Sequence, residues 1–201
     1  MSAVTKIKKE DLVKGAIKII RDKGENELSA RNLAKVVGCS TQPIFRIFKN
    51  MDDLKNTVYD DVYEIQNKFI SSNTDHQVPF IGVGLSYIEF ATKEKNLFKF
   101  LFMSEMSKNN NILDMAKNES GKEYIDMIIK STGLSKESSK QIYINTWLII
   151  HGIASMMATT NSKLNNKEIE TIIFDAFKGY RQTLMNKELN NKYKKNTDTP
   201  Q

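Results

Sequence analysis

The chain has 201 residues, of which 40% are hydrophobic and 27% charged, as in a soluble globular protein with one medium domain or two small ones. Its single cysteine, Cys39, excludes an internal disulfide framework and any paired-cysteine metal or redox motif, and favours a reducing cytoplasm. The net charge of +6 lies in residues 1–50, which hold 11 Lys and Arg against 5 Asp and Glu. This asymmetry predicts that the basic segment meets a polyanion; a solvated surface with chance asymmetry is the alternative.

Helical spacing predicts the first element over about residues 9–23. Leu12, Ala16 and Ile20 recur there on one side of a helix, and Gly24 follows as a stop signal. The absence of a long apolar run before the first charges also argues against a secretory signal.

Two short helices are predicted next, over residues 30–37 and 41–48. Ser29 is a suitable N-cap for the first of them, and Gly38 is a suitable end. Ser40 can cap the second. Two short helices joined by a glycine turn have the dimensions of a helix-turn-helix, although the same pattern also occurs in plain helical bundles.

The rest of the chain is predicted to be helical as well, with no convincing strand. Asn50 and the acids after it open a long helix that ends near residue 72. Further helices are expected over residues 80–94, 97–106, 122–132, 136–160 and 166–189. The sequence therefore predicts an all-α fold of about nine helices. The polar tail, residues 190–201, is expected to be frayed.

The second short helix would present its first residues to the major groove of DNA. Thr41 and Gln42 are therefore candidate base contacts, since glutamine can bond to adenine edges and a threonine methyl can touch thymine. The apolar residues Ile44, Phe45 and Phe48 are predicted to anchor this helix to its neighbours.

Basic and cap residues surround this unit and are candidates for phosphate contacts, which set register and salt dependence. They are Lys8, Lys9, Ser29, Arg31, Ser40, Arg46, Lys49 and Asn50. Exposed lysine and arginine side chains are common, so the alternative is that these residues are simply solvated.

Residues 8–62 resemble the N-terminal domain of the TetR family of transcriptional regulators. The similarity comprises the run L-A-x-x-x-G-x-S from Leu33, an aromatic pair three residues apart, and N-x-D-x-L from Asn50. Two positions depart from the pattern. Phe45 stands where such proteins often have a tyrosine that contacts a phosphate, and Met51 stands where they often have a lysine.

The second half resembles the same family. Trp147, His151 and Gly152 form a W-x-x-x-H-G arrangement, similar to the subgroup whose ligand domain is named for its Trp-His-Gly signature. The resemblance implies a homodimer in which the last two long helices of each subunit pair into a four-helix bundle. It also implies a DNA-binding domain in residues 1–50, a connecting helix in 51–72, and an effector-binding and dimerisation domain in 73–189.

Apolar and aromatic residues of the second half could line an effector pocket, or they could be plain core. They are Phe98, Phe102, Met103, Tyr124, Met127, Trp147, His151 and Met156. For His151, a satisfied core histidine is the competing reading.

The favoured function is a ligand-released repressor that binds double-stranded DNA at a palindromic operator. The expected effector is small and apolar or amphipathic; no cofactor, metal or membrane partner is expected, and the location is cytoplasmic. An enzyme is disfavoured, because the sequence has no nucleophile elbow, phosphate loop or metal-ligand cluster. A helical DNA-binding or adaptor protein without an effector is the alternative.

Overall fold

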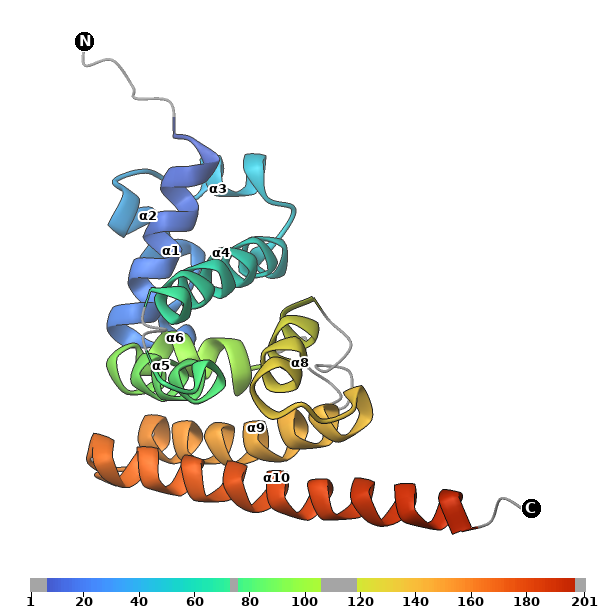
Figure 1. Cartoon of the computed structure of the whole chain (residues 1–201). Coiled ribbons are helices and arrows are strands. Elements are labelled where there is room, and N and C mark those ends of the chain that lie inside the picture. Colours follow the sequence, from blue (N-terminus) through green and yellow to red (C-terminus); the bar gives the residue numbers. More distant parts are fainter. Residues whose placement is uncertain (1–6, 73–75, 106–118, 198–201) are drawn as a thin grey trace. The chain divides into compact units, whose positions relative to one another are not determined.

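The computed structural model describes residues 7–72, 76–105 and 119–197. Over these residues the chain forms nine α-helices, one short 3-10 helix and no strand, so the predicted all-α fold is confirmed (Figure 1). The described residues divide into two compact units: 7–72 with 90–105, and 76–89 with 119–197. These are packing units. The functional division predicted from the sequence stays a prediction.

The first unit is built around its N-terminal helix. Its elements are α1 (Lys9–Lys23), η1 (Glu25–Glu27), α2 (Ala30–Val37), α3 (Gln42–Ile47), α4 (Met51–Ser71), the last residues of α5 (Pro79–Lys93) and α6 (Lys95–Phe102). Helix α1 contacts α2, α4 and α6, and the residues Leu12, Leu33, Leu54 and Phe98 are fully buried in this unit. Residues that recur at helical spacing in the sequence therefore meet in one core.

Local signals set the boundaries of these helices. The Ser29 hydroxyl accepts a bond from the Asn32 N–H at 3.2 Å, and the Asn50 side-chain oxygen accepts one from the Asp53 N–H at 2.8 Å. Gly38 ends α2 with a φ of 73°, in the left-handed region that glycine adopts without strain. The caps predicted at Ser29 and Asn50 and the stop predicted at Gly38 are confirmed.

The start of α3 differs from the prediction. Thr41 is its N-cap, with helical backbone angles (φ −72°, ψ −19°) and no side-chain cap bond, so Ser40 does not cap this helix. Pro43 occupies the first turn, where its missing N–H removes no helical bond.

A close approach of α1 and α2 depends on Gly15. A Cβ at this position would lie 2.6 Å from Cγ2 of Val37 and 3.1 Å from Cδ1 of Leu33. Valine has a stiff, branched side chain that cannot easily rotate away. The missing side chain at Gly15 therefore lets the helix-turn-helix pack directly onto α1.

The second unit is a set of helices packed around α9. Its elements are residues 79–89 of α5, α8 (Glu119–Thr132), α9 (Lys136–Thr159) and α10 (Asn166–Thr197). Helices α9 and α10 run side by side (Figure 1), and α8 also packs against α9. The ring of Phe80 lies at its centre, 6.0 Å from the Tyr143 ring and 6.2 Å from the Phe177 ring.

Helix α9 is long and apolar enough to cross a membrane by length and composition, since an 18-residue window within it has a mean hydropathy of 1.2. The helix packs against α8 and α10, and its buried residues include Ile142, Ile150 and Ala154. This packing accounts for the buried apolar residues of α9, while Leu148 and Met156 on the same helix are exposed.

Helix α10 continues through Thr197, so the expected fraying of the tail is not seen over residues 190–197; residues 198–201 lie outside the described residues. An Oε1 atom of Glu188 ties α10 to the first turn of α9. It accepts bonds from the Ser135 N–H at 3.1 Å, the Ser135 hydroxyl at 2.5 Å and the Ser138 hydroxyl. These bonds favour the carboxylate and lower the pKa of Glu188.

Candidate nucleic-acid interface

Helix α3 has one buried side and one exposed side. Ile44 is fully buried, and Phe48, at the C-cap, is 2% exposed. Gln42 and Arg46 are exposed, and both lie roughly opposite Ile44 on a helix of 3.6 residues per turn. Ile44 and Phe48, which the sequence predicts as anchors, are core residues. The predicted reading residue Gln42 faces solvent, and Thr41 is half-buried.

Phe45 is not an anchor, contrary to the sequence-based prediction. Half of its side chain, 50%, is exposed. The physical reason is the shortness of α3: six residues leave room for one fully buried position, which Ile44 takes. Phe48 reaches the core because it leaves the helix with an extended backbone (φ −116°, ψ 137°), and the Nζ atom of Lys9 lies 5.5 Å from its ring centroid.

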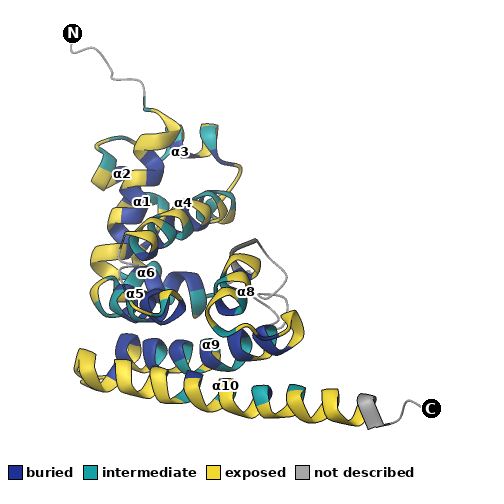
Figure 2. Cartoon of the chain, in the orientation of Figure 1, coloured by how far each residue is buried: buried dark blue, intermediate teal, exposed yellow. Residues whose placement is uncertain are grey.

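The helix-turn-helix and the residues that flank it are rich in exposed cations. No Asp or Glu occurs between Leu28 and Met51. The basic residues predicted to bind phosphate are all exposed, and none of them forms an ion pair within the described residues. They are Lys8, Lys9, Arg31, Arg46 and Lys49. The cations are therefore available for an external anion, which is the electrostatic pattern of a nucleic-acid surface. Helices α2 and α3 both carry exposed residues (Figure 2).

The polar phosphate candidates already take part in local structure. Ser29 and Asn50 use side-chain oxygens as helix caps, and the Lys49 N–H donates to Oδ2 of Asp53 at 3.0 Å. The Ser29 hydroxyl proton and the Asn50 amide protons can still face a phosphate. Ser40 is exposed in the turn.

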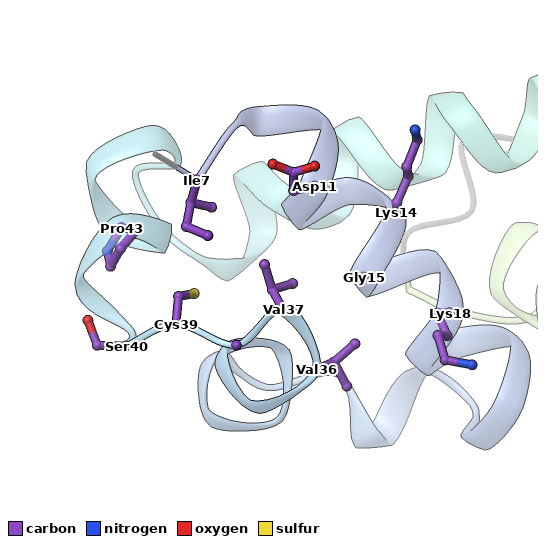
Figure 3. A pocket seen from close by; sticks show the side chains of 11 residues that line it. Ile7, Asp11, Lys14, Gly15, Lys18, Val36, Val37, Cys39, Ser40 and Pro43 are labelled. Carbon is purple, nitrogen blue, oxygen red and sulfur yellow. The ribbon is translucent and has the colours of Figure 1, made fainter. Parts of the chain in front are cut away.

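A groove of about 820 Å³ runs between α1 and the turn before α3 (Figure 3). Gly15, Val37 and Cys39 line it, and it reaches Ser40 and Pro43. The groove leaves the turn partly unpacked on the side of α1. The single thiol, Cys39, is half-buried in this wall, as expected for a small turn residue.

The predicted effector residues of α6 belong to the first unit. Phe98 is fully buried there, and its ring centroid lies 4.9 Å from that of Phe102. Met103, just after α6, is 42% exposed. Phe98 is therefore a core residue, Phe102 is half-buried beside it, and Met103 does not line an enclosed pocket.

The remaining effector candidates lie in the second unit. Tyr124 and Met127 are half-buried on α8, and the Tyr124 ring joins the Phe80 cluster at 6.4 Å. Met156 is 56% exposed on α9, so it does not line an enclosed pocket either. The candidates on α8 stay predictions.

Trp147 and His151 stack on each other with ring centroids 4.7 Å apart and planes tilted by 12°. The hydroxyl oxygen of Tyr87, on α5, lies 2.8 Å from Nδ1 of His151, within hydrogen-bond distance. Burial lowers the pKa of His151, so the neutral imidazole is favoured. Tyr87 was not predicted from the sequence as part of this cluster. A buried tyrosine hydroxyl needs a hydrogen-bond partner, and only this requirement could have indicated a polar contact for Tyr87.

No family model matches the chain, and no curated protein matches its sequence. Among solved structures, a TetR-like transcriptional regulator from Rhodococcus sp. RHA1 is similar with a TM-score of 0.59 and 12% identity, over 84% of this chain and 92% of that one. A second TetR transcriptional regulator from the same organism gives a TM-score of 0.52 and 12% identity, over 87% and 97%. The chain therefore has the fold of the TetR-like transcriptional regulators.

Proposed function

We propose that the chain is a sequence-specific DNA-binding regulator of transcription. The exposed side of α3 carries this proposal. Gln42 and Arg46 face solvent there, beside cations that have no acidic partner within the described residues. In a helix-turn-helix the second helix enters the major groove, where a glutamine can make two bonds to adenine. The other cations would grip phosphates and set the register.

The regulator would act as a homodimer on a palindromic operator. Leu148, Gly152 and Met156 follow one another at four-residue spacing on α9 and form an exposed side that we call the α9 stripe. A Cβ on Gly152 would meet nothing within 4 Å, so a second backbone has room to approach. Two reading helices would then enter successive major grooves, about 34–36 Å apart.

Release of DNA by a small apolar or amphipathic effector completes the proposal, and the cluster of Trp147, His151 and Tyr87 supports it. The Trp147 and His151 rings stack on each other, and both residues are only half-buried, so part of this ring pair is open to a ligand. An effector would have to favour one conformer by about 1–3 kcal/mol to release DNA. Membership of the Trp-His-Gly subgroup stays a prediction.

The DNA proposal is tested by selecting binding sites from random duplex DNA. The expected result is an enriched palindrome. With Gln42→Ala, the affinity for this operator is expected to fall by about 1–3 kcal/mol, with relaxed preference at one base position per half-site. The matched variant Lys49→Ala should instead weaken binding evenly across sequences and lower the salt slope by about 1.

Selection without an enriched palindrome would favour the alternative, a helical DNA-binding or adaptor protein that does not regulate through an operator. Unchanged affinity and sequence preference in Gln42→Ala would refute the reading role of that residue alone.

The effector proposal has its own readout, because Trp147 is the only tryptophan of the chain. Binding of an apolar or amphipathic compound beside it is expected to shift or quench the intrinsic fluorescence, and the same compound should weaken operator binding. His151→Phe keeps an aromatic ring on Trp147 but removes the imidazole, so affinity for the compound should fall. A compound that releases DNA without any change in Trp147 fluorescence would place its site elsewhere.

A further inference from the structure

Phe45 is the large apolar side chain that α3 leaves in solvent. Half of its surface is exposed, whereas the neighbouring Ile44 and Phe48 are buried. Its ring has no aromatic or cation partner within the described residues. Leaving such a ring in water forgoes part of the stabilisation that burial of a phenylalanine gives. The ring therefore contributes little to the fold and is available to a partner.

The surroundings of this ring restrict what that partner can be. Arg46 is the next residue, Lys49 follows soon after, and no acid lies between Leu28 and Met51. Both cations are exposed. A complementary partner combines negative charge with a small apolar group at its surface. The major groove of DNA offers this combination, because phosphates flank the groove and the 5-methyl group of thymine projects into it.

Resting on the proposed DNA-binding function, we propose that Phe45 reads sequence by packing its ring against the 5-methyl group of a thymine. Phe45 lies one turn after Thr41 and three residues after Gln42, so its ring borders the same exposed side of α3 as Gln42. A phenyl ring has no hydroxyl and cannot donate a hydrogen bond to a phosphate. At this position an apolar contact with a DNA base takes the place of a contact with the DNA phosphate backbone.

The test uses the full-length protein and the operator obtained by selection. Each thymine of the half-site is replaced in turn by uracil, which removes the methyl group and leaves the base-pairing edge unchanged. Wild-type protein is expected to lose about 3- to 5-fold in affinity per half-site at one thymine position, as expected for loss of one buried methyl contact. Phe45→Ala should bind the thymine and uracil operators equally.

Two variants serve as controls. Gln42→Ala should keep its sensitivity to uracil at that position, because it lacks a different base contact. Phe45→Leu should keep part of the sensitivity, because leucine still offers an apolar surface. Since Phe45 is half-exposed, its variants should unfold at nearly the wild-type temperature, which is measured alongside.

The outcomes separate this inference from the function on which it rests. If no palindrome is selected at all, the proposed function fails. If an operator is bound but uracil is tolerated at every position, or Phe45→Ala keeps the wild-type sensitivity, the reading role of Phe45 is wrong and the proposed function stands. Uniform weakening in Phe45→Ala, independent of thymine, would also overturn it by indicating a backbone contact.

Discussion

Replacement of Phe48 by alanine is expected to lower the free energy of unfolding by about 3–5 kcal/mol. Phe48 is 2% exposed and has Lys9 over its ring, so truncation leaves a cavity beneath the N-terminal helix. The loss is a large fraction of the stability of a typical domain. Urea unfolding followed by circular dichroism measures it, and the midpoint should shift while the denaturant slope stays constant.

Phe45→Ala is the matched control, since it also truncates a phenylalanine and lies only three residues before Phe48. With half of the ring already in solvent, the expected loss of stability is within about 1 kcal/mol. Equal losses for the two variants would contradict the assignment of Phe48 to the core and Phe45 to the surface.

Two charges on the α9 stripe are expected to separate the proposed dimer. In Leu148→Glu combined with Met156→Glu, carboxylates of two copies would face one another across an apolar contact without a partner charge. Both residues are exposed in the single chain, 42% and 56%, so the fold of each subunit should survive. Operator affinity should fall by about 10²–10⁴-fold, because the two half-sites are then bound independently.

Sedimentation measures the mass directly. The wild-type protein should sediment at twice the 23.0 kDa of one chain, and the double variant at the mass of one chain. The control, Asn26→Glu with Asn56→Glu, adds the same charge at exposed positions of the first unit, outside α9 and α10. If the control also dissociates, the added charge rather than the α9 stripe separates the subunits; if neither variant dissociates, the α9 stripe does not form the dimer.

Several features of the molecule follow from local sequence alone. The bounds of α1 and α2 agree with the periodic apolar residues and with the stop signals Gly24 and Gly38. The start of α4 agrees with the cap at Asn50. These signals act within one turn of helix, so no distant contact is needed to set them. The basic character of the first 50 residues is likewise a property of composition.

Other features needed the fold. Residues 90–105 fall within the predicted effector-binding and dimerisation domain, yet they pack with the N-terminal helices. The Arg21 guanidinium pairs with the Glu94 carboxylate at 2.9 Å, and the Asn96 amide donates to the Arg21 carbonyl at 3.0 Å. Neither contact has a local signal, because about 75 residues separate the partners. The extension of α10 through Thr197 also escaped prediction, since a polar segment shows no apolar period.

The sequence by itself determined that α3 exists, that its first turn tolerates Pro43 and that its surroundings are basic. It could not assign the two phenylalanines, because a six-residue helix is too short to show an apolar period and both residues have the same chemistry. Tertiary structure decided between them: α3 ends before Phe48, whose extended backbone turns its ring into the core beneath Lys9. Phe45 stays within the helix, beside Ile44, which already fills the buried position, and its ring therefore remains in solvent.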